Sequence, residues 1–142
     1  MNKTFRASLD ELPIMLDFIK HEAHVVSFKE YEIAKIVLAA EEAIVNVISY
    51  GYPNKTPGSI QINCLPDAQK GIDIIIRDDG IPYNPLENFD TLRYIPDIPD
   101  RSHSLDHRKI GGIGRLVIFH IMDNVSYERD GEFNVLILQK HL

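Results

Sequence analysis

One long amphipathic helix constrains the fold of this chain more than any other segment. Apolar residues recur at helical spacing over about 28–50, after Ser27 and Glu30, which have the spacing of a capping box. Gly51 and Pro53 end the pattern. The apolar stripe consists of Ile33, Ile36, Val37, Ala40, Ile44, Val47 and Ile48. Because these side chains share one side of the helix, we expect that side to pack on a sheet.

The rest of the chain supplies the strands for such a sheet. The run from Ile72 to Ile76 is almost wholly apolar and is typical of a central strand. Strands are expected, in chain order, at 5–8, 59–65, 71–77, 125–129 and 133–140, with further helices at about 8–26 and 115–122. The last two strands form a hairpin that turns at Asp130 and Gly131. The predicted fold is an α/β (α+β) two-layer sandwich: a mixed, mainly antiparallel sheet of four or five strands with helices on one face.

Length and charge narrow the class of protein. The chain of 142 residues can bury a substantial core, and it shows no repeat or linker, so we expect one domain over 1–142. A net charge of −6 argues against nucleic-acid binding, which needs a broad basic face. The single cysteine, Cys64, fits a reducing compartment. No run approaches the ~20 apolar residues of a membrane span. We therefore predict a cytoplasmic protein that binds neither nucleic acid nor membrane.

Glu42 and Asn46 lie one turn apart on the long helix, opposite its apolar stripe. A carboxylate can orient or deprotonate a nucleophile, and an amide oxygen suits a hard cation such as Mg²⁺. The neighbouring side chains of Leu38, Ala39 and Ala43 are too apolar and too small for a surface left open to water. Two interpretations remain open at this stage, a solvated polar face and a covered site.

Asp78 follows the run of isoleucines, at the point where a buried strand ends. A carboxylate at such a position can accept a hydrogen bond from an exocyclic amine such as that of adenine, and Gly80 lets a flat ring approach the backbone. An ordinary Asp-Gly turn is the alternative interpretation of the same residues.

A glycine cluster opens the helix expected near the C-terminal end of the chain. Gly111, Gly112 and Gly114 provide unobstructed backbone N–H groups and a positive helix end, both suited to phosphates. The preceding segment 85–110 contains three prolines and no clear period, and a segment of this kind is either a functional lid or a wrong assignment. The alternative for the glycines is a flexible hinge beside a solvated charge run. The chain has no P-loop motif.

Taken together, these motifs resemble those of the GHKL superfamily of ATP-binding domains, which includes gyrase and the histidine kinases. The most specific segments are Glu-Glu-Ala-Ile-Val-Asn-Val-Ile-Ser-Tyr-Gly-Tyr-Pro at 41–53, Arg-Asp-Asp-Gly-Ile-Pro-Tyr-Asn-Pro at 77–85 and Gly-Gly-Ile-Gly-Arg-Leu-Val at 111–117. Within the superfamily, the chain is most similar to the anti-sigma-factor serine/threonine kinases of bacteria. Tyr50 stands where that family often has histidine, and Pro82 replaces the second glycine of its D-x-G-x-G box.

The resemblance implies the Bergerat ATP-binding fold and a role for each residue of the three motifs. Glu42 matches the general base, Asn46 the magnesium ligand, and Asp78 with Gly80 the adenine-binding box. The remaining matches are the glycines at the end of the ATP lid, Gly111, Gly112 and Gly114, with the lid itself at about 85–110. The implied cofactors are ATP and Mg²⁺.

The function that the resemblance implies is that of an ATP-dependent anti-sigma regulatory factor. Such a protein is a serine/threonine kinase that phosphorylates an anti-sigma-factor antagonist, sequesters a sigma factor, or does both, and it can form a homodimer. A non-catalytic module, in which bound nucleotide gates the binding of a phosphatase or another signalling partner, is the alternative. A purely structural domain that binds no nucleotide is a third possibility.

Overall fold

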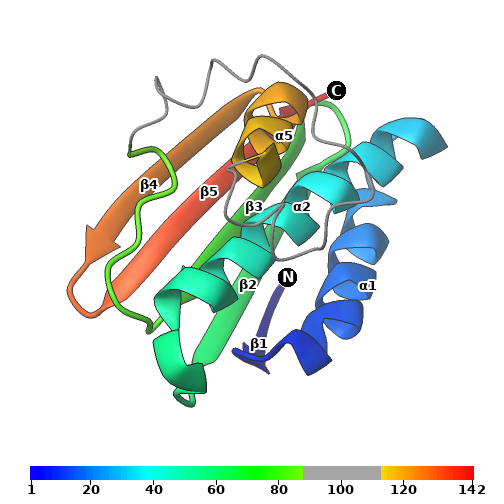
Figure 1. Ribbon diagram of the computed structural model, residues 1–142. Coiled ribbons are helices and arrows are strands. Elements are labelled where there is room, and N and C mark those ends of the chain that lie inside the picture. The colour runs from blue at the N-terminus through cyan, green and yellow to red at the C-terminus, as the bar shows by residue number, and fades with distance from the viewer. Residues whose placement is uncertain (88–112) are drawn as a thin grey trace, which may run out of the picture.

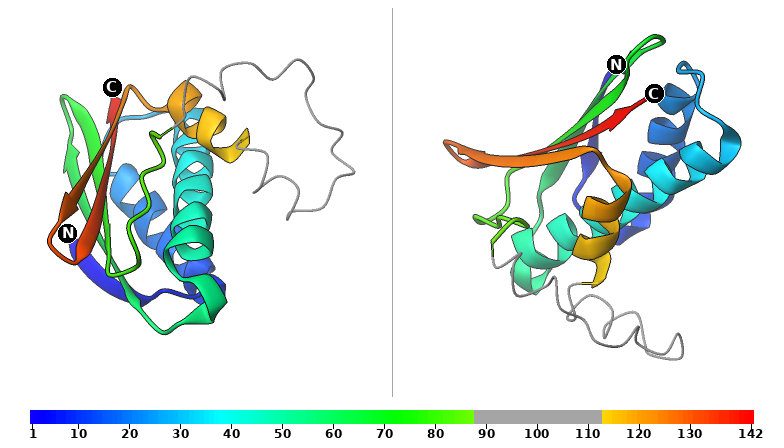
Figure 2. Two further views of the ribbon diagram at one scale, coloured as in Figure 1. Left: turned by 60° about the vertical axis from the view of Figure 1, so that its left-hand side comes forward. Right: turned by 90° about the horizontal axis from the view of Figure 1, so that it is seen from above.

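A five-stranded sheet and a layer of helices make up the fold in the computed structural model, which describes residues 1–87 and 113–142. The strands are β1 (Asn2–Arg6), β2 (Ser59–Asp67), β3 (Gly71–Asp78), β4 (Asn124–Asp130) and β5 (Phe133–His141). The helices are α1 (Leu12–Ala23), α2 (Glu30–Gly51) and α5 (Ile113–Ile121), with single 3₁₀ turns η1 (Leu9–Glu11) and η2 (Pro53–Lys55). The helices lie on one face of the sheet (Figures 1 and 2), which confirms the predicted α+β sandwich.

The strand order is β1-β2-β3-β5-β4, and every neighbouring pair is antiparallel. β3 therefore lies in the middle of the sheet, as its run of isoleucines predicts, and Ile74 and Ile76 are fully buried. Residues in register form rows across the face that the helices cover. One such row joins Ile62, Ile76 and Leu136. The row at the end of β3 joins Ile60, Asp78 and Asn134, so the apolar core ends there in two buried polar side chains.

α2 packs across the sheet with the side that its apolar stripe predicts. Ile33, Ile36 and Ile44 are buried to 2% exposure or less. Ala39 and Ala43 are also buried, on the side of α2 that leads towards Glu42, where α5 packs beside it (Figure 1). Because alanines occupy that side, a second helix can approach α2 closely. The polar face of the helix is thus partly covered by α5, which favours the covered site over the solvated face, although Leu38 on this helix is 41% exposed.

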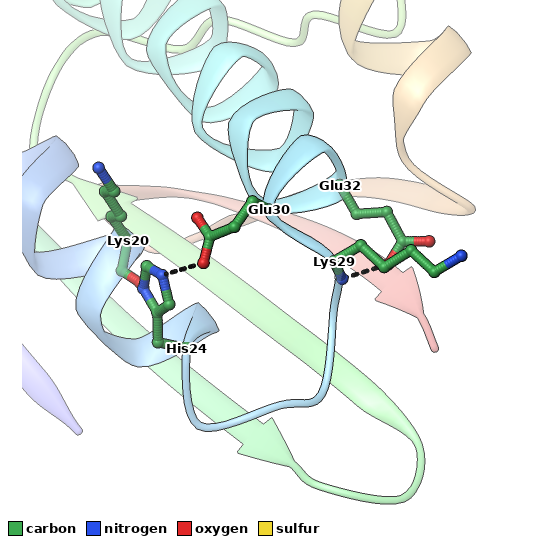
Figure 3. A network of polar contacts seen from close by, with 5 residues as sticks. All are labelled: Lys20, His24, Lys29, Glu30 and Glu32. Carbon is green, nitrogen blue, oxygen red and sulfur yellow. Dashed lines mark hydrogen bonds and ion pairs between the residues drawn. The ribbon is translucent and has the colours of Figure 1, made fainter.

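The start of α2 differs from the prediction. The helix begins at Glu30, its N-cap is Lys29, and the backbone N–H of Lys29 donates to Glu32 Oε2 at 3.1 Å. The capping box expected from Ser27 and Glu30 is therefore wrong. Glu30 instead accepts from the His24 ring at 3.2 Å, across the connection from α1 (Figure 3). A tertiary contact between two helices thus uses the carboxylate that the sequence assigned to a local cap.

Candidate functional site

The carboxyl group of Asp78 is the most deeply buried acid of the described chain, at 2% exposure. Its Oδ1 atom accepts hydrogen bonds from the backbone N–H of Gly80 at 2.9 Å and from Asn134 Nδ2 at 3.0 Å. Within residues 1–87 and 113–142, no hydrogen bond reaches Oδ2. Burial raises the pKa of this carboxyl group, and the bonds from Asn134 and Gly80 offset part of the rise. Asp78 does close a local turn with Gly80, and it keeps one oxygen for a further donor.

Gly80 brings the end of β3 against the end of α2. A Cβ atom at this position would lie 2.5 Å from the carbonyl oxygen of Gly51 and 2.9 Å from Asp78 Oδ1. The same carbonyl oxygen accepts the N–H of Ile81 at 2.9 Å. Close backbone approach, and no unusual dihedral angle, is therefore the reason for glycine here. The contact places Asp78 directly beside the last turn of α2.

Asp79, the second acid of the pair, holds this junction together. Its Oδ1 atom accepts from the Tyr52 hydroxyl at 2.5 Å and from the Ser59 backbone N–H at 3.0 Å. Its own N–H donates to the Tyr52 hydroxyl oxygen at 3.0 Å. Burial, followed by the bond to Asp79, raises the pKa of Tyr52. The two neighbouring carboxylates thus differ in role, since Asp79 connects α2, β2 and β3 while Asp78 faces inward.

Asn134 is a residue of the site that the sequence motifs did not indicate. It lies on β5 in register with Asp78, at 3% exposure. Besides Asp78, its Nδ2 atom donates to the Ile81 carbonyl oxygen at 2.8 Å. Its Oδ1 atom accepts from the Tyr83 N–H at 3.2 Å and from the Tyr127 hydroxyl at 2.5 Å. The only signal for it in the sequence is a polar residue within an apolar strand.

Glu42 and Asn46 also lie on α2, towards its N-terminus from the contact between Gly51 and Gly80. Asn46 is 5% exposed and Glu42 is half-buried. Gly114, in the first turn of α5, lies against Glu42, because a Cβ atom there would overlap Glu42 Oε2 and come within 3.3 Å of Cδ. The nine residue steps from Glu42 to Gly51 correspond to a rise of about 13 Å along the helix. α2 therefore contacts the glycine of the third motif at Glu42 and, at its C-terminal end, the turn that carries the acid of the second motif.

The described segments that flank residues 88–112 contact α2 and α5. The Arg115 guanidinium donates to the carbonyl oxygens of Pro85 and Glu87, at 3.1 and 3.0 Å. The ring of Tyr83 stacks on that of Tyr50 with centroids 4.8 Å apart. Gly111, Gly112 and nearly all of the predicted lid at 85–110 lie outside the described residues.

The described part of the chain contains no group of three or more His, Cys, Asp or Glu residues able to hold a metal ion. A hollow of about 380 Å³ lies on the sheet surface away from the helices, between Thr4, Gln61 and Arg77. None of the described candidate site residues, Glu42, Asn46, Asp78, Gly80 and Gly114, lines it. No helix among the described residues is long and apolar enough to cross a membrane.

A buried acid at a strand end, an acid and an amide one turn apart on a covering helix, and a glycine in the first turn of α5 are the features expected of a nucleotide-binding α+β sandwich. Comparison with known proteins agrees with this class. Residues 5–140 match the histidine kinase-like ATPase domain, and the chain belongs to this family. Membership implies that the chain binds ATP and acts as a kinase or an ATPase.

Three characterised relatives are similar to the chain over most of its length. The serine/threonine-protein kinase BtrW of Bordetella bronchiseptica is 28% identical over 106 residues, which cover 75% of this chain and 68% of the relative. The anti-sigma F factor of Clostridium novyi is 30% identical over 109 residues, 77% of this chain and 70% of the relative. The anti-sigma F factor of Priestia megaterium is 27% identical over 112 residues, 78% of this chain and 71% of the relative.

Proposed function

We propose that this chain is an ATP-dependent anti-sigma regulatory factor. It transfers the γ-phosphoryl group of ATP to a serine or threonine of an anti-sigma-factor antagonist, and it sequesters a sigma factor. The observation that carries the proposal is a pair of contacts made by α2, in which Glu42 meets Gly114 and Gly51 meets Gly80 beside Asp78. The similar proteins, a serine/threonine kinase and two anti-sigma factors, support the regulatory role.

At the base end of the site, Asp78 would accept a hydrogen bond from the exocyclic amine of adenine. Its Oδ1 atom is already engaged by Gly80 and Asn134, so the amine would bind Oδ2. Because Gly80 has no side chain, the backbone after β3 leaves room for a flat ring. The residues present therefore fit the base of ATP.

At the phosphate end, Asn46 would hold Mg²⁺ through its side-chain oxygen. Mg²⁺ in nucleotide sites is bound by one or two protein groups together with the substrate phosphates. The absence of a cluster of metal-binding side chains in the described ranges is in keeping with such a site. When bound, magnesium and ATP supply the transferable phosphoryl group and neutralise the charge that develops on it. The first turn of α5, from Ile113, presents backbone N–H groups that suit phosphate oxygens.

Glu42 would act as the general base, one turn from Asn46. As the acceptor's hydroxyl oxygen bonds to the γ-phosphorus, the bond to the oxygen that bridges the β- and γ-phosphates breaks, and ADP leaves. Glu42 takes the proton of that hydroxyl group. A positioned base of this kind contributes about 10²- to 10⁴-fold to the rate.

The test is transfer of labelled γ-phosphate to a candidate antagonist, recovered by affinity capture in the presence of magnesium and ATP. Glu42→Gln should lower transfer at least about 100-fold while ATP affinity changes only a few-fold. Glu41→Gln, which alters the neighbouring half-buried acid, is the matched control and should retain transfer. Unchanged transfer by the Glu42 variant would remove this residue as the base.

A second function is favoured by the two positions that depart from the kinase pattern, Tyr50 and Pro82. Tyr50 is 38% exposed and stacks on Tyr83, so a phenol ring occupies the place of the more usual imidazole. In this alternative, bound nucleotide gates the binding of a phosphatase or another signalling partner, and no phosphate moves. Tight ATP binding by the wild-type protein, without transfer or hydrolysis, would select it.

A further inference from the structure

The buried side chain of Asn134 uses all of its hydrogen-bonding capacity, both as a donor and as an acceptor. The amide nitrogen carries two hydrogens, which go to Asp78 Oδ1 at 3.0 Å and to the Ile81 carbonyl oxygen at 2.8 Å. The amide oxygen accepts from the Tyr83 N–H and from the Tyr127 hydroxyl. An asparagine side chain offers two donors and two acceptor positions. All four are therefore used.

This set of partners fixes the orientation of the amide. If the group were turned over, its oxygen would face two acceptors, Asp78 Oδ1 and the Ile81 carbonyl oxygen, and its nitrogen would face the Tyr83 N–H. A buried amide so placed would lose the favourable bonds and leave polar groups unpaired, which is costly. The structure thus holds Asn134 in one state, with its donors directed at Asp78.

The orientation of Asp78 follows from that of Asn134. Two donors, one from β5 and one from the backbone after β3, hold the same oxygen of the carboxyl group. The other oxygen is thereby turned away from both. The two donated bonds favour the ionised form and offset part of the rise in pKa that burial causes. In the ionised form the other oxygen can only accept a hydrogen bond.

We infer that Asn134 is a positioning residue that makes the site selective for purines with an amino group at position 6. This inference rests on the proposed function, because it concerns the base of the nucleotide that Asp78 receives. Adenine presents a donor at position 6, whereas hypoxanthine and guanine present a carbonyl oxygen. An acceptor held in place rejects that oxygen, since the two acceptors would face each other with neither paired.

Other charged groups near Asp78 do not account for the same selectivity. Asp79 lies next to it in sequence and disfavours its ionised form, whereas the positive charge of Arg129 favours that form. Arg129 donates to the Gly80 carbonyl oxygen at 3.0 Å, so its charge acts on the site without a bond to the carboxyl group. Asn134 is the side chain that both donates to the Asp78 carboxyl group and is held in one orientation by its other hydrogen-bond partners.

The experiment compares the affinities for ATP and for ITP, which differs from ATP only at position 6 and on the adjacent ring nitrogen. Asn134→Asp keeps the size of the side chain and exchanges the donating amide for a second acid. We expect the ratio of ATP to ITP affinity to fall at least about tenfold. Asn134→Thr, which retains one donor, should recover part of the ratio. Asn124→Asp, at an exposed position on β4, is the matched control and should leave the ratio unchanged.

A second variant keeps the test decisive if the substitution of Asn134 impairs folding. Tyr127→Phe retains the ring and removes only the hydroxyl group that donates to Asn134, so the ratio should fall about two- to tenfold. A merely structural role would weaken both nucleotides equally, and an unchanged ratio in the Asn134 and Tyr127 variants would overturn the inference. Failure of the wild-type protein to bind either nucleotide would instead overturn the proposed function.

Discussion

Replacing Asp78 by asparagine should move stability and nucleotide affinity in opposite directions. The side chain is 2% exposed, and burial raises the pKa of its carboxyl group above the ordinary value, despite the bonds from Asn134 and Gly80. The folded state therefore holds the proton more tightly than the unfolded state does. Ionisation of Asp78 then costs stability once the pH exceeds its unfolded pKa, and the full cost is present above the folded pKa. An uncharged asparagine has no such cost.

The asparagine variant should be more stable than wild type at pH 8, and this advantage should shrink towards pH 4. Its side-chain oxygen can accept the bonds from Gly80 and Asn134 at the places where Asp78 Oδ1 now accepts them. Affinity for ATP should fall, because an amide N–H₂ group would face the amine of adenine. A lost bond to a charged acceptor together with an unpaired donor costs about 3 kcal/mol or more, which is at least about 100-fold in affinity.

Urea unfolding at pH 5 and pH 8 measures the first effect, and calorimetric titration with magnesium and ATP measures the second. Asp73→Asn is the matched control, because Asp73 lies on the same strand, is half-buried, and accepts from Gln139 at 3.2 Å. It should leave ATP affinity unchanged. A lower stability of Asp78→Asn at pH 8, or an undiminished ATP affinity, would refute the reasoning about this carboxyl group.

Three further predictions follow from close contacts and from burial. Gly80→Ala should lower the free energy of unfolding by about 1–3 kcal/mol, measured by urea unfolding, because its Cβ atom would lie 2.5 Å from the Gly51 carbonyl oxygen. Gly114→Ala should leave stability nearly unchanged, since the close contact of the new methyl group is with the flexible carboxyl end of Glu42. The same methyl group should displace that carboxylate, the proposed base, and slow phosphoryl transfer about tenfold or more. The Cys64 thiol, whose pKa burial raises to about 12, should react with a thiol reagent at pH 8 only as fast as the protein unfolds.

Each of these has a result that would contradict it. Wild-type stability in Gly80→Ala would mean that α2 and β3 are not in close backbone contact. Undiminished phosphoryl transfer by Gly114→Ala would show that the contact between Gly114 and Glu42 does not matter for catalysis. Labelling of native Cys64 within seconds would show that the thiol is open to solvent.

The layers of the fold could be predicted because burial leaves a periodic pattern in sequence. The stripe of α2 and the isoleucine run of β3 both have the spacing of their elements, and both are buried as expected. The boundaries were less accurate. β1 was expected at 5–8 and covers Asn2–Arg6, and α2 begins at Glu30 with a cap from Lys29. Such details depend on contacts between elements, for example His24 with Glu30, which local spacing does not record.

The site could be predicted only where its chemistry lies in short motifs. Asp78 and Gly80 are two residues apart, and Glu42 and Asn46 are one helical turn apart, so short motifs in the sequence indicate both pairs directly. Asn134 is 56 residues from Asp78, and the register of β5 on β3 alone decides that the two side chains meet. A single sequence does not specify that register.

The junction formed by Tyr52 and Asp79 was missed for a related reason. The sequence presents Asp78 and Asp79 as equivalent neighbours, and alternation along the strand separates them. The first faces the helices, and the second binds Tyr52 at the strand end. Which of two adjacent acids is available to a ligand depends on the direction of each side chain, which the sequence alone does not give.

The most direct test of the central claim is a crystal structure with magnesium and a non-hydrolysable analogue of ATP. We expect the 6-amino group within hydrogen-bond distance of Asp78 Oδ2, the metal on the side-chain oxygen of Asn46, and the γ-phosphate near Glu42. A nucleotide bound elsewhere on the molecule, or one whose base contacts neither Asp78 nor the backbone at Gly80, would contradict it.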